Sequence, residues 1–173
     1  KYDFDDIRNV IERSSARETA MRVALGSVCR KLLESFNIHV GSYVSSIFKI
    51  TDENDYSSLS PIEINNKADT SDVRSLDSDI EKQMIQVIKN AKKNGDSVGG
   101  SFKVIISGVP YGLGSYTSWD SKLNSRLGEA ILSINGIKSF SIGDGDNSKN
   151  KLGSELHDEI DFENAKYTRL SNN

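Results

Sequence analysis

The chain has 173 residues and a formal net charge of −3, with 36% hydrophobic and 27% charged residues. This length suits one ordinary domain, and the composition excludes a disordered chain. The small negative charge gives no whole-chain attraction to nucleic acid or to an anionic membrane, so a bound anion needs a local cluster of positive charge. No apolar run approaches the roughly 20 residues of a membrane helix. The chain opens on Lys1 rather than on methionine, which suggests a piece of a longer protein.

One cysteine, Cys29, excludes an internal disulfide and indicates a reducing compartment such as the cytoplasm. It lies beside Val28 in a helical pattern, so we expect a buried and unreactive thiol.

In chain order, the first predicted element is a helix from about 15 to 36. Its start is marked by Ser15, followed three residues later by Glu18, which is the pattern of a capping box. One helical face is apolar and is expected to be buried; it consists of Met21, Ala24, Leu25, Val28, Leu32 and Phe36. Residues 40–50 are rich in β-branched and aromatic residues and predict a strand. The polar stretch 52–75 is interpreted as a surface excursion with little regular structure.

A second helix is predicted over 77–94, with Gly95 as its stop. Its apolar stripe consists of Ile80, Met84, Val87, Ile88 and Ala91. A strand over 100–109 follows and ends at Pro110. The remaining predictions are a helix over 119–134 and short strands over 137–142, 159–162 and 166–170. Together these elements predict a single domain over residues 1–173, of mixed α and β structure, with helices covering sheet faces.

The most informative stretch is residues 13–20, RSSARETA. A helix start leaves backbone N–H groups unpaired and carries a partial positive charge. Arg13 precedes the predicted cap and Arg17 lies in the first turn, with two serine hydroxyls between them. Oriented N–H groups and guanidinium groups are what a phosphate or carboxylate site needs. The alternative is an ordinary capped helix with two solvated arginines.

Three other sequence patterns are candidates for a chemical role. Residues 96–100, DSVGG, put two glycines where a strand begins, which allows close approach by a ligand or by neighbouring backbone. Residues 112–114, GLG, lack the third glycine of a dinucleotide fingerprint. The spacing of the acidic residues in 144–155 is similar to that of a calcium-binding loop. Lys149 occupies the position where such a loop needs glycine, so we expect a solvated acidic loop. His39 and His157 form no persuasive catalytic arrangement.

Taken together, these stretches resemble the chorismate synthases. Residues 13–20, followed by Arg22-Val23-Ala24, are similar to that family's signature. Further similar stretches occur in family order; they are DSVGG at 96–100, GVPYGLGS at 108–115, SINGIK at 133–138, IGDG at 142–145, Gly153-Ser154 with Asp158-Glu159, and SNN at 171–173. Several motifs in register are far more specific than any one of them.

The resemblance implies an α+β fold, a β-α-β sandwich, in a homotetrameric enzyme. The implied reaction is a 1,4-elimination of phosphate from 5-enolpyruvylshikimate 3-phosphate, which gives chorismate. This makes the enzyme a carbon–oxygen lyase of the shikimate pathway and of aromatic amino acid biosynthesis. Reduced FMN is the implied cofactor and is not consumed overall, with NADPH as a candidate reductant.

The resemblance also assigns site residues. It implies that Arg13, Ser14 and Ser15 line the flavin, and that Asn135 with Gly136 contacts it. Arg17, together with Ala16, is implied to reach the substrate. Many members have alanine where this chain has Gly136. The family's catalytic histidines belong to a segment before Lys1, so no catalytic residue is assigned within 1–173 and we expect this portion alone to be inactive. The alternative is a non-catalytic core that binds flavin or another anion, or that serves oligomerisation.

Overall fold

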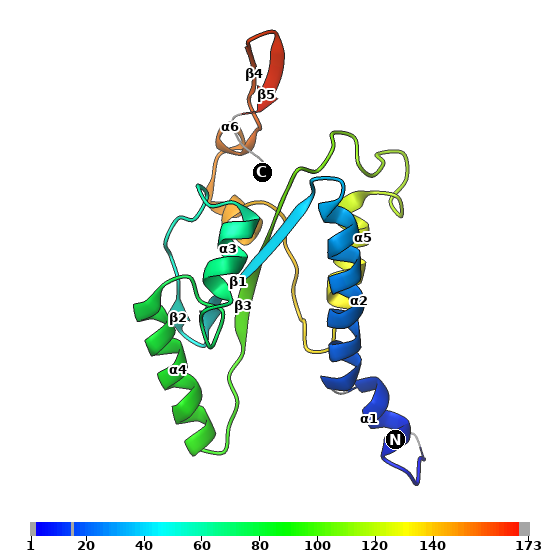
Figure 1. Ribbon diagram of the computed structural model, residues 1–173, viewed down its shortest axis with the longest axis vertical. Coiled ribbons are helices and arrows are strands. Elements are labelled where there is room, and N and C mark those ends of the chain that lie inside the picture. The colour runs from blue at the N-terminus through cyan, green and yellow to red at the C-terminus, as the bar shows by residue number, and fades with distance from the viewer. Residues whose placement is uncertain (1–2, 15, 170–173) are drawn as a thin grey trace. The chain divides into compact units, whose positions relative to one another are not determined.

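The computed structural model describes residues 3–14 and 16–169, and it contains both helices and antiparallel strands (Figure 1). Its contacts group the chain into two compact units. Arg22–Tyr111 form one unit, and the described parts of Lys1–Met21 and Gly112–Asn173 form the other. The α+β class expected from the sequence is confirmed, whereas the single domain and the β-α-β sandwich stay predictions. Within the described ranges, no helix combines the length and the apolar character needed to cross a membrane.

The sheet of the Arg22–Tyr111 unit has the order β2-β1-β3, with antiparallel neighbours. Its strands are β1 (His39–Ile47), β2 (Ile50–Thr51) and β3 (Gly100–Ser107). The strand expected over 40–50 is confirmed over 40–47 as part of β1, but its end is wrong. The chain reverses at Phe48 and Lys49, so that Ile47 pairs with Ile50. Phe48 takes φ +55 in this turn. Two-residue turns usually signal themselves by Asn or Gly, and this one carries neither.

The pairing of β1 with β3 runs from His39 opposite Ser107 to Ile47 opposite Gly100, with a register shift between Val44 and Ser46. The shift leaves Ser45 outside the ladder as a bulge, and Ser45 is buried. Its hydroxyl is 2.8 Å from the hydroxyl of Ser101, so the bulged residue keeps a polar partner.

Residues 52–75 are not the irregular excursion that we expected, because they contain α3 (Pro61–Ala68). A full capping box starts this helix: the Glu63 N–H donates to Ser60 Oγ at 3.3 Å, and the Ser60 N–H donates to Glu63 Oε2 at 2.8 Å. Pro61 occupies the first helical position, where its missing N–H costs nothing. The signal S-P-I-E was present in the sequence and was overlooked.

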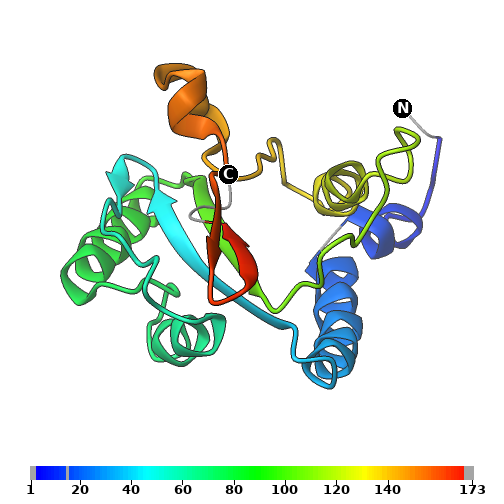
Figure 2. The ribbon, with the colours of Figure 1, turned by 90° about the horizontal axis from the view of Figure 1, so that it is seen from above.

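The same segment supplies the core of this unit. Ile64 and Ala68 of α3 are fully buried, and they cluster with Tyr43 of β1 and with Leu76. The helix packs on β1, as both views of the ribbon show (Figures 1 and 2). The apolar positions 64 and 68 are one helical turn apart, so a short helix in a polar sequence still presents a buried face.

The helix predicted over 77–94 is confirmed as α4 (Ser78–Lys93). The Asp77 carboxylate accepts the N–H groups of Asp79 at 2.8 Å and Ile80 at 2.9 Å, which caps the first turn. Gly95, at φ +70, ends the helix as expected. Its predicted apolar stripe faces inward, with Met84 fully buried.

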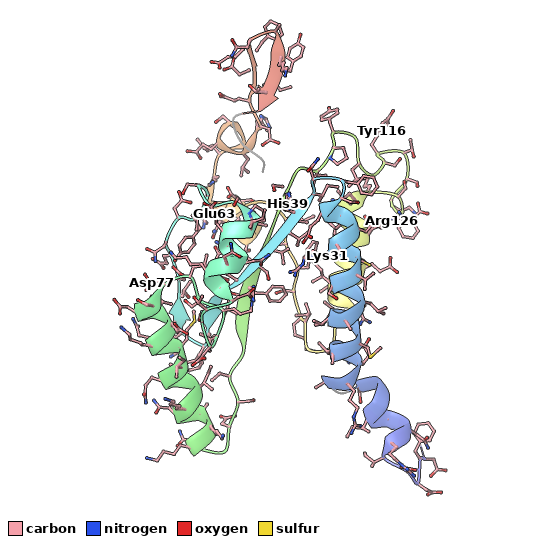
Figure 3. The ribbon with its side chains drawn as sticks, in the orientation of Figure 1. Lys31, His39, Glu63, Asp77, Tyr116 and Arg126 are labelled. Carbon is pink, nitrogen blue, oxygen red and sulfur yellow. The ribbon has the colours of Figure 1, made fainter. Side chains whose placement is uncertain are left out.

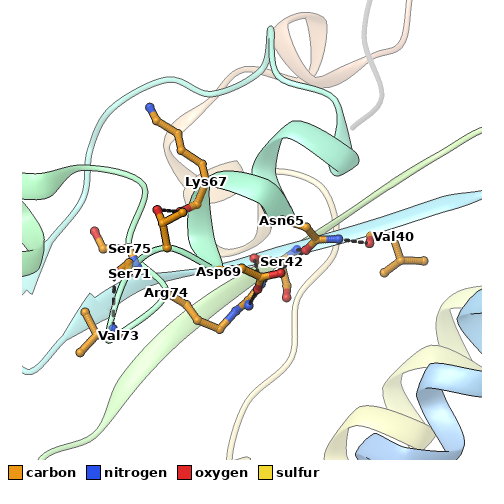
Figure 4. A network of polar contacts seen from close by, with 10 residues as sticks. Val40, Ser42, Asn65, Lys67, Asp69, Ser71, Val73, Arg74 and Ser75 are labelled. Carbon is orange, nitrogen blue, oxygen red and sulfur yellow. Dashed lines mark hydrogen bonds and ion pairs between the residues drawn. The ribbon is translucent and has the colours of Figure 1, made fainter.

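Along one edge of β1, the backbone groups pair with Asn65 and Arg74 instead of with a neighbouring strand (Figure 4). The Asn65 amide accepts the Ser42 N–H at 3.1 Å and donates to the Val40 carbonyl at 2.8 Å. Arg74 donates to the Ser42 carbonyl at 2.9 Å, and its own carbonyl accepts the Val44 N–H at 2.9 Å. These contacts satisfy backbone groups that would otherwise form an unpaired sheet edge.

A buried carboxylate lies just after β2. Asp52 accepts the N–H of Asn54 at 3.1 Å and the hydroxyl of Tyr56 at 2.9 Å, which satisfies both of its oxygens. Burial of the phenol, together with this hydrogen bond to a carboxylate, raises the pKa of Tyr56 to about 12. The Tyr56 ring also meets Tyr43 edge-on at 5.5 Å between centroids, so the polar pair is continuous with the core.

The second unit contains short elements; they are α1 (Arg8–Ser14), the start of α2 (Ala16–Glu34), α5 (Leu123–Leu132), the 3₁₀ helix η1 (Gly145–Asn150), α6 (Gly153–Leu156), β4 (Ile160–Glu163) and β5 (Lys166–Arg169). The helix expected over 119–134 is thus shorter than predicted. The strand expected over 137–142 is wrong, since that stretch has no ladder partner among the described residues. The strands near 160 and 166 are confirmed as an antiparallel hairpin.

The helix predicted from about 15 to 36 is confirmed as α2, but its expected buried face is wrong. None of the residues of α2 is buried in the structure, and Leu25, Val28 and Leu32 are each more than 60% exposed. Cys29 is exposed as well, contrary to the buried thiol that we expected. An amphipathic period identifies a face that can be buried, but a covering surface must come from elsewhere in the structure.

Candidate functional site

The first candidate feature is the junction of α1 and α2 (Figure 1). Arg13 and Ser14 precede the start of α2, as expected, but they belong to a further short helix, α1, that was not predicted. The start of α1 has its own signal, which we overlooked: the Asp6 carboxylate accepts the Arg8 N–H at 2.9 Å. Ser15 and the side chain of Arg13 lie outside the described residues.

The Ser14 side chain forms a hydrogen bond within its own helix. Its hydroxyl donates to the Val10 carbonyl at 2.9 Å, one helical turn earlier. In this arrangement the oxygen of Ser14 can accept a hydrogen bond from a ligand, while donation to a phosphate requires the hydroxyl to rotate.

The first turn of α2 carries Ala16, Arg17 and Glu18. Ala16 and Arg17 are exposed, and Glu18 is half-buried. The dipole of this 19-residue helix favours negative charge at its start. Arg17 adds a guanidinium group that can hold a phosphate or a carboxylate through two parallel hydrogen bonds. Glu18 opposes that charge, so the site combines a cation and an anion on one turn.

The second candidate feature is the turn after α5. The Ile137 N–H donates to the Ile134 carbonyl at 3.1 Å, which closes a four-residue turn around Asn135 and Gly136. Gly136 has φ +90, and a Cβ added there would meet no described atom within 4 Å. A positive φ at the third position is typical of a type II turn and favours glycine. The backbone at Gly136 is therefore open to close approach.

The structure brings these two features together. Asn135 Nδ2 donates to Glu18 Oε2 at 3.4 Å, between residues that are 117 positions apart in the sequence. Both residues belong to the same compact unit. The start of α2 and the turn at Asn135 thus form one site, with Arg17 and Ala16 on the same helical turn as Glu18. No pattern in the sequence indicates this contact, since the sequence pattern around Glu18 predicts only a capping role.

The glycines of the DSVGG stretch serve the sheet. A Cβ on Gly100 would lie 2.3 Å from the Ser46 carbonyl oxygen of β1. The neighbouring Gly99 carbonyl accepts the Phe48 N–H at 2.8 Å. Of the two partners considered for these glycines, neighbouring backbone is the one observed. An open, largely apolar groove of about 510 Å³ adjoins the stretch, with Lys92 and Asp96 among its lining residues.

The acidic loop at 144–150 forms η1, and its carboxylates pair with lysines. Asp146 is 2.6 Å from Lys149 Nζ, and Asp144 pairs with Lys151. In residues 3–14 and 16–169, no group of three or more His, Cys, Asp and Glu side chains could hold a metal ion.

Two other side chains can be located directly. His39 lies at the start of β1, and Tyr116 projects from the loop before α5 with 91% of its surface exposed (Figure 3). The turn at 112–114, rejected as a nucleotide motif, instead packs closely: a Cβ on Gly114 would lie 2.9 Å from the Leu123 side chain.

The fold and this site define an α+β protein in which the first turn of a long helix contacts an asparagine turn. A family model described as chorismate synthase matches residues 1–173. The chain therefore belongs to the chorismate synthase family.

Individual relatives agree with this assignment. The chain is 48% identical over 173 residues to the chorismate synthase of Alkaliphilus metalliredigens, covering 99% of this chain and 45% of that protein. It is 45% identical over 174 residues to the chorismate synthase of Enterococcus faecalis, covering 100% of this chain and 45% of that protein. A crystal structure of chorismate synthase superposes with a TM-score of 0.89 at 39% identity, covering 99% of this chain and 54% of that one. The chain thus spans about 45% of the length of these curated relatives.

Proposed function

We propose that this chain is a portion of a chorismate synthase and supplies one wall of its flavin and substrate site. The observation that carries the proposal is the contact of Asn135 with Glu18, which joins two of the stretches that resemble the family's site. The family match over the whole chain supports the same reading. The proposed reaction is the 1,4-elimination of phosphate from 5-enolpyruvylshikimate 3-phosphate, in which phosphate and a proton leave and a double bond forms without net oxidation.

The residues present fit a flavin with a terminal phosphate. Asn135 offers an amide and Gly136 offers backbone without a side chain to the flavin, while Arg17 offers a guanidinium group to the anionic substrate beside it. These groups suit a phosphate and the polar edge of a planar ring. Reduced FMN, when bound, supplies the electron-rich ring on which the elimination depends. In the proposal Arg13, Ser14 and Ser15 add to the flavin wall, and Ala16 lies beside the substrate.

The chain's own residues bind and orient in this proposal, and they transfer no proton. Arg17 holds an anionic group of the substrate through charge-assisted hydrogen bonds. Asn135 and Gly136 fix the position of the ring, which limits the entropy lost when the reacting atoms meet. Proton transfer requires positioned acids and bases, and the proposal places these outside residues 1–173.

The test is phosphate release under anaerobic conditions with the substrate and chemically reduced FMN. The complete gene product should release phosphate and form chorismate, whereas residues 1–173 alone should release none. Absence of turnover by the complete protein, with its flavin bound, would contradict the proposed reaction. Turnover by residues 1–173 alone would contradict the placement of the proton-transfer groups. NADPH as reductant, a homotetramer and a cytoplasmic location belong to the same proposal.

The second candidate is a non-catalytic oligomerisation core, and the exposed apolar side chains of α2 favour it. Met21, Leu25 and Leu32 are each more than 60% exposed. Apolar side chains gathered on one element are typical of surfaces that become covered in an assembly. Light scattering separates the candidates: a homotetramer with no flavin affinity and no turnover favours this second function.

A further inference from the structure

The contact between Glu18 and Asn135 determines which way the asparagine amide faces. An ionised carboxylate can only accept hydrogen bonds, so the group directed at Glu18 Oε2 must be the Asn135 NH₂. The amide is planar, and its carbonyl Oδ1 therefore points away from the Glu18 carboxylate. Because residues 134–137 form a closed turn, the backbone beneath this side chain is held as well.

We propose that Glu18 is a positioning residue, which orients the Asn135 amide so that Oδ1 accepts a hydrogen bond from an N–H of the flavin ring. This inference rests on the proposed flavin site. Without the Glu18 carboxylate, this contact no longer favours NH₂ over Oδ1 on that side, and the reversed amide would present its NH₂ where the acceptor belongs. Two N–H groups would then oppose each other, and one polar group would be left without a partner.

Charge repulsion alone predicts the opposite change in FMN affinity when Glu18 is removed. A carboxylate on the first turn of α2 lies beside a site proposed to hold a flavin phosphate and an anionic substrate. If charge alone mattered, removing Glu18 would reduce repulsion and tighten FMN binding. If Glu18 positions Asn135, removing it weakens FMN binding. The two explanations therefore differ in the direction of the effect as well as in its size.

The experiment measures FMN affinity of the complete protein by flavin fluorescence, without any turnover. Glu18→Ala is expected to weaken FMN binding by about fivefold, as is Asn135→Ala. Glu18→Gln keeps an acceptor for the Asn135 NH₂ and should stay within about twofold of the wild type. The decisive variant combines Glu18→Ala with Asn135→Ala. Because Glu18 acts through Asn135, the double variant should be no weaker than either single variant.

A purely structural role for Glu18 predicts a different pattern. Loss of a favourable first-turn charge would act independently of Asn135, so the two losses would multiply in the double variant. Multiplied losses, unchanged affinity in Glu18→Ala, or tighter binding in Glu18→Ala would each overturn the inference. Failure of the wild-type protein to bind FMN would instead overturn the proposed function, so the two failures are distinguishable.

An exchange variant keeps the inference testable if Glu18→Ala does not fold. Asn135→Asp places two carboxylates against each other and should weaken FMN binding. Adding Glu18→Gln restores the hydrogen bond with donor and acceptor exchanged, because the glutamine amide now donates to the new carboxylate. Recovery of at least about half of the lost affinity, as free energy, is expected. No recovery would contradict a positioning role.

Discussion

Replacement of Asn65 by alanine should destabilise the Arg22–Tyr111 unit, because the Asn65 side chain pairs with an edge of β1 that no strand covers there. Asn65 Oδ1 accepts the Ser42 N–H, and its Nδ2 donates to the Val40 carbonyl (Figure 4). Asn65→Ala removes both of these hydrogen bonds. Val40 and Ser42 are only half-buried, so water can reach the backbone groups that lose their partner. Each hydrogen bond contributes about 1 kcal/mol net, so the loss is about 2 kcal/mol of unfolding free energy.

Asn66→Ala is the matched control, because Asn66 is the next residue of α3 and is exposed. Both substitutions gain the same helix propensity, about 0.5 kcal/mol. Their difference therefore isolates the edge contacts of Asn65. Urea unfolding of the two variants, with unchanged slopes, measures this difference.

Amide hydrogen exchange gives an independent reading at the edge itself. In Asn65→Ala the Ser42 N–H loses its acceptor and should exchange faster than in Asn66→Ala. Equal unfolding free energies, within about 0.5 kcal/mol, together with unchanged protection of Ser42, would refute the reasoning. That result would mean that water replaces the asparagine amide without cost.

Three further outcomes are expected. Gly100→Ala should lower the free energy of unfolding by more than about 2 kcal/mol, because the added Cβ would meet the Ser46 carbonyl oxygen at 2.3 Å. Gly99→Ala has open space around it and should lower the free energy of unfolding by less than about 1 kcal/mol. Equal losses for the two variants in chemical denaturation would contradict this prediction. The raised pKa of Tyr56 means that the folded state prefers the protonated phenol. The free energy of unfolding should therefore fall as pH rises from 10.0 towards about 12. The same decline in a Tyr56→Phe variant would exclude this tyrosine as the cause. Arg17→Ala should weaken substrate binding by at least about tenfold at an unchanged melting temperature, and unchanged affinity would discard the anion site.

Local signals were sufficient for several elements. The helix α4 begins at a capping Asp77 and ends before Gly95, and each signal acts within one helical turn. The start of α2 at Ala16 was likewise readable from the sequence. The capping box of Ser60 and Glu63 at α3 is an equally local signal, but the polar composition around it favours irregular structure. Composition does not exclude such a helix, because Ile64 and Ala68, one helical turn apart, already give it a buried face.

For the candidate site, the sequence supplied the residues and only the tertiary structure joined them. Arg17, Asn135 and Gly136 were named from motifs in two separate stretches. No periodicity or spacing connects Glu18 with Asn135, because a contact across 117 residues depends on how the chain is folded between them. The placement of Arg13 and Ser14 on α1 was missed for a related reason: a short helix is only marginally stable alone and needs support from its surroundings.

The sequence by itself determined where α2 and α4 start and stop, which faces are apolar, and which family the motifs resemble. These properties depend on neighbours one to four positions apart, within reach of a single turn. The tertiary structure decided what each face meets. Thus Ile64, in a polar stretch, is fully buried, while Leu25, in a clear apolar stripe, is 64% exposed. Burial requires a second surface, and that surface comes from residues distant in the chain.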